Sequence, residues 1–148
     1  MNETSDTQAD WPAHLPARQV RVARPTDQLD AVMRFYHHGL GLPELRRFDG
    51  HDGYSGVMFG LPGGDYHLEF THHVDGSPCP APTADNLLVL YFDSGDDVDA
   101  VAGRLAALAG HPVEAENPYW PQNGGITFED PDGWRVVLMP ARAFSGPR

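Results

Sequence analysis

The residues best suited to chemistry in this chain of 148 residues lie in one short segment, His67-Leu68-Glu69-Phe70-Thr71. On a β-strand the side chains of His67, Glu69 and Thr71 share one face, while Leu68 and Phe70 occupy the other. An imidazole and a carboxylate on one face could form a hydrogen-bonded pair, transfer a proton or, with a third donor, hold a divalent metal. Because only two donors are visible, we favour the hydrogen-bonded pair.

Glu69 is the best single candidate for a catalytic group. In an apolar pocket, loss of hydration would make this carboxylate a stronger base, able to act on a carbon acid, or an anchor for a cation. The structural alternative is a strand carboxylate that pairs with His67, Arg24 or Arg135. Both alternatives place Glu69 in the candidate site, and they make Arg24 and Arg135 candidate contacts.

A second candidate feature is the aromatic pair Tyr119-Trp120, which Pro118 and Pro121 bracket. We expect this loop at the mouth of a pocket, where the rings could stack on a planar ligand or hold a cation over a π face. The same composition also suits a packed loop or a contact between subunits. Asn86 and Tyr54 are candidates for further polar contacts with a ligand.

The elements that would position these side chains form a pattern that occurs twice. A strand at 19–23 precedes a helix in which apolar residues recur at helical spacing from Leu29 to Tyr36, and Thr26 or Asp27 could cap that helix. Short strands follow at 44–48, 54–61 and 66–72. The second copy has a strand at 86–93, a helix that begins at Ser94, and strands at 113–116, 126–129 and 134–139.

Two turn and linker signals complete this pattern. Asp130-Pro131-Asp132-Gly133 predicts a tight hairpin turn, because proline fixes φ and glycine supplies a positive φ. Residues 74–85 contain three prolines within five positions and predict a linker without a strand. The order is therefore βαβββ twice, and strands grouped in threes argue against a doubly wound parallel sheet.

Certain residues within this order resemble the vicinal-oxygen-chelate (VOC) superfamily, which includes glyoxalases, bleomycin-resistance proteins and dioxygenases. The resemblance rests on Arg24-Pro25-Thr26-Asp27, Gly39-Leu40-Gly41-Leu42 and Ile126-Thr127-Phe128-Glu129-Asp130-Pro131-Asp132-Gly133. The segment Glu116-Asn117-Pro118-Tyr119-Trp120 resembles an uncharacterised bacterial branch. The resemblance implies an α+β domain at 19–142, in which modules 19–73 and 86–142 form a cupped, eight-stranded mixed sheet with two helices. It also implies a homodimer.

The resemblance further implies four metal-ligand positions inside the cup, on the first and last strand of each module. We place them at Val20, Glu69, Asn86 and Val137; a shift of one residue would put Arg21 at the first. Only Glu69 has good ligand chemistry, and catalytic sites for divalent metals usually need about three protein ligands. We therefore predict no metal ligands and no cofactor, with a divalent metal only if His67 and Glu69 form a rebuilt site.

Composition narrows the range of partners. The formal net charge is −11 and the chain contains no lysine, which argues against nucleic acid, because phosphate recognition needs clustered basic residues. No apolar run is long enough to span a bilayer, so no membrane association is expected. Cys79 is the only cysteine, and residues 1–18 and 143–148 suggest flexible tails without a signal peptide. We expect a cytoplasmic protein.

Three hypotheses about function follow. The leading one is metal-independent binding of a small organic molecule, cationic or aromatic, in the cup, as the resemblance to bleomycin-resistance proteins implies; such a protein would confer antibiotic resistance by sequestration. The acidic charge would attract cationic guests. The second is a lyase, isomerase or dioxygenase with Glu69 as general base or sole retained metal ligand. The third is a non-catalytic dimeric scaffold.

Overall fold

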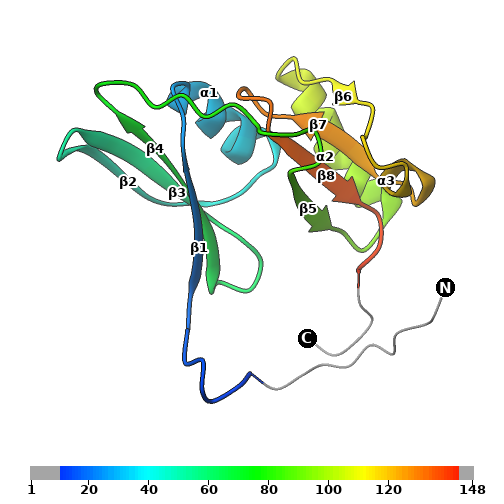
Figure 1. The fold of residues 1–148 in the computed structure, drawn as a ribbon. Helices are drawn as coiled ribbons and strands as arrows, with labels where there is room; N and C mark the ends of the chain where they lie inside the picture. The colour runs from blue at the N-terminus through cyan, green and yellow to red at the C-terminus, as the bar shows by residue number, and fades with distance from the viewer. Residues whose placement is uncertain (1–10, 144–148) are drawn as a thin grey trace.

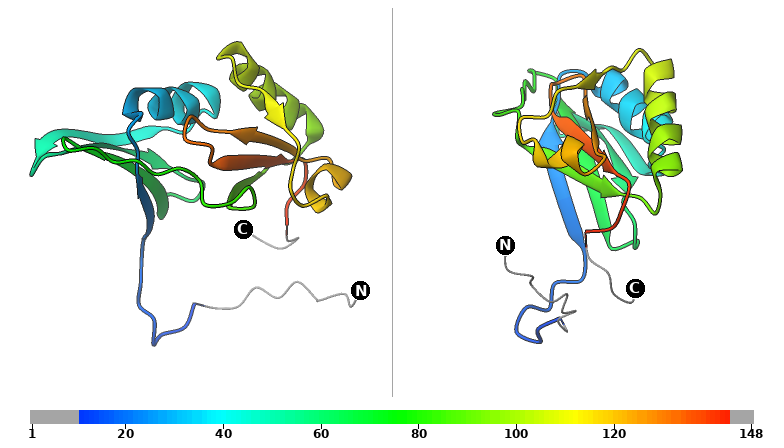
Figure 2. Two further views of the ribbon diagram at one scale, coloured as in Figure 1. Left: turned by 45° about the horizontal axis from the view of Figure 1, so that its top comes forward. Right: turned by 90° about the vertical axis from the view of Figure 1, so that its right-hand side faces the viewer.

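The computed structural model describes residues 11–143 and contains two similar halves. In each half one helical segment lies on one side of a four-stranded sheet, and both helical segments lie on the same side of the molecule (Figures 1 and 2). The predicted α+β class and the doubled βαβββ order are confirmed, and the strands form two separate four-stranded sheets. Of the predicted tails, residues 1–10 and 144–148 lie outside the described residues, and residues 11–18 form neither helix nor strand.

The first sheet has the order β1-β4-β3-β2, in which β1 runs parallel to β4 and the other neighbours are antiparallel. Its strands are β1 (Val20–Pro25), β2 (Glu44–His51), β3 (Tyr54–Gly60) and β4 (Tyr66–His73). The second sheet repeats this arrangement as β5-β8-β7-β6. Its strands are β5 (Leu87–Tyr91), β6 (Pro112–Val113), β7 (Ile126–Glu129) and β8 (Arg135–Met139).

The first helix changes its hydrogen-bond pattern after five residues. Regular α1 (Leu29–Met33) continues as the π-helical segment η1 (Arg34–Gly39), which the apolar spacing does not predict. The N-cap is Gln28, whose side chain makes no capping bond; Thr26 instead accepts a hydrogen bond from the Gln28 N–H at 2.9 Å. The expected caps Thr26 and Asp27 were therefore placed one or two residues too early.

In the second half, α2 (Gly95–Ala107) begins where the sequence predicts. The Ser94 side chain accepts a hydrogen bond from the Asp97 N–H at 3.2 Å, and Val98, Val101 and Leu105 are buried. A further short helix, α3 (Tyr119–Gln122), occupies the expected loop, and β6 is shorter than the predicted strand at 113–116. The linker 74–85 forms no strand, as its prolines predict.

One apolar core joins the two halves on the helical side of the sheets. It contains Val32, Phe35, Phe59, Leu68 and Phe70 from the first half together with residues of α2, β7 and β8. The two helical segments pack closely, because a Cβ atom at Gly39 would lie only 2.5 Å from Leu105 Cδ2. Because residues of both halves contribute to this core, the two halves pack together as one body.

Candidate functional site

The main cleft lies between the two halves, with β1 and β4 on one side and β5 and β8 on the other. Its volume is about 370 Å³, within the lower range of small-molecule sites. Four of the predicted site residues line this cleft: Arg24, Glu69, Asn86 and Arg135. A second cleft of about 360 Å³ adjoins it and is lined by His67 with mostly apolar residues. The two clefts share Val22, Leu61 and Leu88.

His67 and Glu69 lie on the face of the first sheet opposite the helices. We call this the open face; it also carries Arg21 and Ala23, which pair with His67 and Glu69 across the β1–β4 ladder. Leu68 and Phe70 belong to the core on the helical side, as the alternation predicts. The strand pattern therefore gave the correct orientation for the His67 segment.

Arg21 lies on this face, at the position where the sequence pattern favoured Val20 and gave Arg21 as the alternative for a shift of one residue. Val20 pairs with Tyr66, so the position beside His67 and Glu69 belongs to Arg21, one residue further along. The Arg21 Nε atom donates to His67 Nε2 at 2.8 Å, and Arg21 Nη1 lies 3.4 Å from Glu69 Oε2. Instead of a direct His67–Glu69 pair, the structure has a guanidinium that contacts both. Neither Arg24 nor Arg135 pairs with Glu69.

On the corresponding face of the second half, Val137 occupies the position that Glu69 has in the first half. Val137 is completely buried and pairs with Val89 and Thr127 across the ladders. Strand alternation places Leu87 on the same face as Val89, in the position that corresponds to Arg21. Asn86, the residue expected there, precedes β5, and its side-chain oxygen accepts a hydrogen bond from Thr83 at 2.6 Å. The register was therefore one residue early in both halves.

These residues do not fit a divalent metal at the four family positions. The positions carry Arg21, Glu69, Leu87 and Val137, and only Glu69 offers an oxygen or nitrogen lone pair to a cation. Arg21 adds a permanent positive charge beside that carboxylate. Within residues 11–143, no group of three or more His, Cys, Asp or Glu side chains is placed to hold a metal ion.

The remaining predicted contacts lie away from the residues that line the clefts. Tyr54 begins β3, is 44% exposed and packs edge-on against His73 with ring centroids 4.7 Å apart. Tyr119 and Trp120 form α3 and contact each other edge-on at 5.0 Å. The Trp120 Nε1 atom is buried without a hydrogen-bond partner among the described residues. The structure thus separates the aromatic pair from Glu69.

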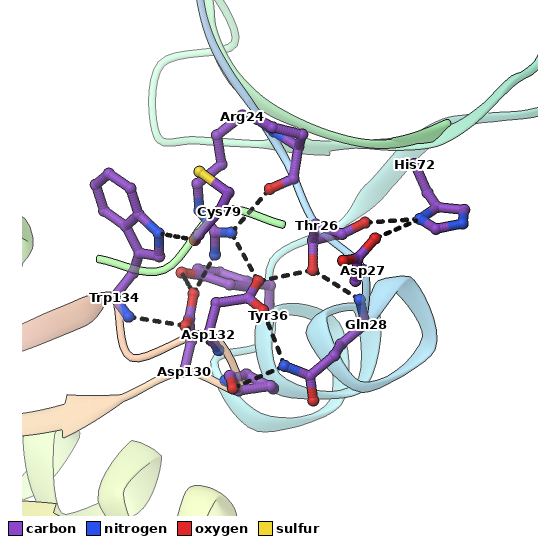
Figure 3. Close-up of polar contacts among 12 residues, drawn as sticks. Arg24, Thr26, Asp27, Gln28, Tyr36, His72, Cys79, Asp130, Asp132 and Trp134 are labelled. Atoms are coloured by element: carbon purple, nitrogen blue, oxygen red, sulfur yellow. Dashed lines mark hydrogen bonds and ion pairs between the residues drawn. The ribbon is translucent and has the colours of Figure 1, made fainter. Parts of the chain in front are cut away.

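Arg24 belongs to a polar cluster that joins the halves, shown in Figure 3. Its guanidinium forms ion pairs with Asp130 and, at 2.8 Å, with Asp132, both in the hairpin turn of the second half. It also lies 4.9 Å from the Phe70 ring centroid and 5.1 Å from that of Trp134. Further hydrogen bonds reach the two aspartates from Tyr36, Thr26 and Gln28. We call these six polar residues, Arg24, Thr26, Gln28, Tyr36, Asp130 and Asp132, the Arg24 network.

Burial and hydrogen bonds together set the pKa values in this network. Burial and the neighbouring Asp130 charge raise the pKa of Tyr36 well above its ordinary value, so its hydroxyl stays a donor. Burial also raises the pKa of Asp130, although Arg24 and Tyr36 oppose that effect. For Asp132, burial raises the pKa, but hydrogen bonds from Thr26, Arg24 and Gln28 outweigh it, so the pKa lies below its ordinary value. Arg24 therefore has two aspartate partners within the protein.

Two signals in the sequence could have revealed these residues. Arg21 and Ala23 are two positions apart on the predicted strand and therefore share one face. Matching that face to the face of Glu69 would have identified Arg21. The two aspartates were recognised only as turn formers. Arg24 and the acidic turn carry opposite charges, which is compatible with an ion pair. About a hundred residues separate them in the sequence, so the local pattern does not predict their contact.

The comparisons with known proteins agree with this architecture. The uncharacterised protein YycE of Bacillus subtilis (strain 168) is 52% identical over 130 residues, which are 88% of this chain and 93% of that protein. A crystal structure of YycE from Bacillus subtilis has a TM-score of 0.86 at 47% identity, with coverage of 93% and 100%. TnmS3, an antibiotic binding protein from Streptomyces sp. CB03234, has a TM-score of 0.60 at 25% identity, with coverage of 86% and 98%.

The doubled βαβββ fold with a cleft between its halves defines a VOC protein of the glyoxalase, bleomycin-resistance and fosfomycin-resistance class. Within that class, residues 20–71 match the YycE-like N-terminal domain and residues 85–140 match the YycE-like C-terminal domain. The chain belongs to the YycE-like family. No helix among residues 11–143 has the length and apolar character needed to cross a membrane.

Proposed function

We propose that this protein binds a small organic molecule in the main cleft without the help of a metal. The observation that carries the proposal is the combination of a mostly apolar cleft with a small number of polar side chains, those of Arg24, Tyr36, Glu69, Asn86 and Arg135. Small-molecule sites typically combine an apolar lining with a small number of placed polar groups. TnmS3, which is similar in structure, is an antibiotic binding protein, and this supports an antibiotic or a related metabolite as the ligand class.

In this proposal Glu69 is an anchoring group and not the general base of an enzyme. Its side chain is 13% exposed, and Arg21 lies beside one of its oxygens. A carboxylate already engaged by a guanidinium is a poorer proton acceptor than a free one. The cleft therefore supports sequestration of a guest better than proton abstraction.

The binding proposal predicts ligand stabilisation that a blocked cleft loses. At about a hundred times the dissociation constant, a ligand should stabilise the protein by about 2.7 kcal/mol, or roughly 5–10 °C in Tm. Bleomycin, fosfomycin and aromatic antibiotics are suitable probes for a thermal-shift assay. Leu88 lines the main cleft and lies on the core side of β5, so Leu88→Trp should abolish the shift.

The matched control is Ala100→Trp, which adds the same side chain to the exposed surface of α2. This variant should keep the full ligand shift. A shift that survives Leu88→Trp would place the binding site elsewhere. If no member of the panel raises Tm, this ligand class is wrong.

We also propose that two copies of the chain associate through the region around β1. Val20, Val22 and Tyr66 there are 45%, 59% and 50% exposed, an unusual concentration of large apolar side chains on a surface. Sedimentation velocity should give the mass of two chains at micromolar protein concentration. A single species with the mass of one chain would contradict the dimer.

A further inference from the structure

A further pocket lies on the helical side of the molecule, between the two helical segments and the hairpin turn, and we call it the helix pocket. Its volume is about 450 Å³, within the range of small-molecule sites. The residues that line it are Ala31, Arg34, Phe35, Leu105, Leu108 and Pro131. None of these residues lines the main cleft or the second cleft, so the helix pocket is a separate site.

The apolar walls of the helix pocket are held in place by packing. A Cβ atom at Gly39 would lie 2.5 Å from Leu105 Cδ2 and 3.5 Å from Leu108 Cδ1, so both leucines pack against η1. Leu105 and Phe35 are buried, whereas Leu108 is 43% exposed. The pocket therefore has a closed apolar floor and an open apolar rim, and both can contact the apolar part of a guest.

Arg34 is the only charged residue among those that line the helix pocket. Its side chain is exposed and forms no hydrogen bond or ion pair with any residue in the range 11–143, Asp30 one turn earlier included. Arg104 on α2 is different, because its side chain already donates to the carbonyl oxygens of Gly39 and Leu40, at 3.1 and 3.0 Å. The guanidinium donors of Arg34 therefore remain available to a ligand.

The backbone beside this pocket has an unusual hydrogen-bond pattern. The π-helical segment η1 begins at Arg34, and the Leu40 N–H bonds to the Phe35 carbonyl at 2.9 Å. π-helical turns are rare and frequently occur at functional sites. Here the turn contributes Arg34 and Phe35 to the lining, which is a second and independent indication of a binding site.

We propose that the helix pocket binds a small amphiphilic anion, whose apolar part contacts Phe35, Leu105 and Leu108 and whose anionic group accepts hydrogen bonds from Arg34. A guanidinium is always charged, and its planar donors match the two oxygens of a carboxylate. The ligand class is therefore a free carboxylate with a short alkyl or aromatic body. This site is additional to the main cleft and does not depend on which molecule binds there.

The test uses probes that share a linear alkyl chain and differ in their polar group: octanoate, 1-octanol and octylamine. Affinities come from NMR titration of the full chain, read from the backbone signals of Arg34 and Leu108. Octanoate should bind about three- to tenfold more tightly than 1-octanol, the scale of a hydrogen-bonded ion pair at a partly exposed site. Octylamine is a cation at neutral pH and should bind more weakly than 1-octanol, because Arg34 repels it.

Variants at position 34 connect this preference to the guanidinium. Arg34→Met should remove the advantage of octanoate and leave 1-octanol binding unchanged, which also shows that the pocket is intact. Arg34→Lys should retain part of the advantage, because it keeps the charge but loses the planar fork. The matched control is Arg46→Met on β2, since Arg46 is also exposed, has no side-chain partner among residues 11–143 and lines neither the clefts nor the helix pocket. It should change no affinity.

Two tryptophan substitutions locate the bound probe. Ala31→Trp fills the helix pocket and should abolish the shifts of the Arg34 and Leu108 signals with every probe. Leu88→Trp in the main cleft should leave octanoate binding at these signals unchanged. Circular dichroism of both variants shows that the fold is kept.

Three results would overturn the inference. They are binding of 1-octanol or octylamine at least as tight as that of octanoate, an octanoate advantage that survives Arg34→Met, and signal shifts that are absent or confined to residues of the main cleft. The thermal-shift assay with Leu88→Trp tests the main cleft separately, so the two proposals fail independently. Added salt should weaken octanoate more than 1-octanol, since only charged contacts are screened.

Discussion

Replacing Arg24 with alanine should lower the free energy of unfolding by about 3–5 kcal/mol, the largest loss expected from any polar substitution in this protein. The substitution leaves two carboxylates without their cation, and the side chain of Asp130 is completely buried. It also removes the contacts of the guanidinium with the Phe70 and Trp134 rings. Denaturation in urea at neutral pH, followed by circular dichroism, measures this loss.

Two comparison variants show whether the effect comes from the buried network. Arg142 pairs with Asp93 at the surface, with side chains 40% and 67% exposed, so Arg142→Ala should cost about 1 kcal/mol or less. Tyr36→Phe removes one hydrogen bond to Asp130 and should cost about 1–3 kcal/mol. If Arg24→Ala lowers the free energy of unfolding no more than Arg142→Ala does, the Arg24 network contributes little to the stability of the contact between the two halves.

The pH dependence has a definite sign for Asp132. Its pKa in the folded protein lies below the ordinary value, because bonds from Thr26, Arg24 and Gln28 outweigh the effect of burial. Its contribution is therefore complete above the pKa of the unfolded chain and is lost as the pH falls through the lowered pKa. The difference in stability between the natural chain and Arg24→Ala should shrink at acidic pH for this reason.

The second large effect is a gain of metal binding. Arg21→His should give a protein that binds one zinc ion, because the new imidazole would share the open face with His67 and Glu69. Three protein ligands and a water molecule are the usual set of a catalytic zinc site. At about a hundred times its dissociation constant, free zinc should stabilise the variant by about 2.7 kcal/mol. Equilibrium dialysis and thermal unfolding measure the two quantities.

The control for this prediction is Arg21→Met, which removes the same guanidinium without adding a donor. It should bind no zinc at this site, and His67→Ala added to Arg21→His should abolish the new binding. Stoichiometric zinc on the natural chain would contradict the conclusion that its donor set does not fit a divalent metal. Equal zinc binding by both position-21 variants would show that the ion is held elsewhere.

The sequence predicted what depends on local patterns. Glycine and proline signals located the hairpin turn, where Gly133 has a φ of 87° and its N–H bonds to the Asp130 carbonyl. Ser94 capped its helix as expected, and alternation placed His67 and Glu69 on one face. Each of these features involves residues only a few positions apart, so the chain pattern contains the necessary information.

What the sequence did not predict depends on distant pairing. The strand phase at Arg21 follows from the hydrogen bonds of β1 with β4, about forty-six residues away, and the preferred placement at Val20 was one residue early. Single-residue slips exchange the two faces of a strand completely. The contacts of Arg24 with Asp130 and Asp132 likewise need the two halves in place. The spacing of apolar residues also did not predict that the first helix becomes π-helical in η1.

The Arg24 network also has a consequence for how a guest would be selected. Because Arg24 lies beside the main cleft and joins β1 to the turn before β8, the distance between the two walls is set when the chain folds. A guest then meets a preorganised opening, and little conformational entropy is lost on association. Such an opening discriminates by size and shape, so we expect a narrow range of molecular widths among the compounds that this protein accepts.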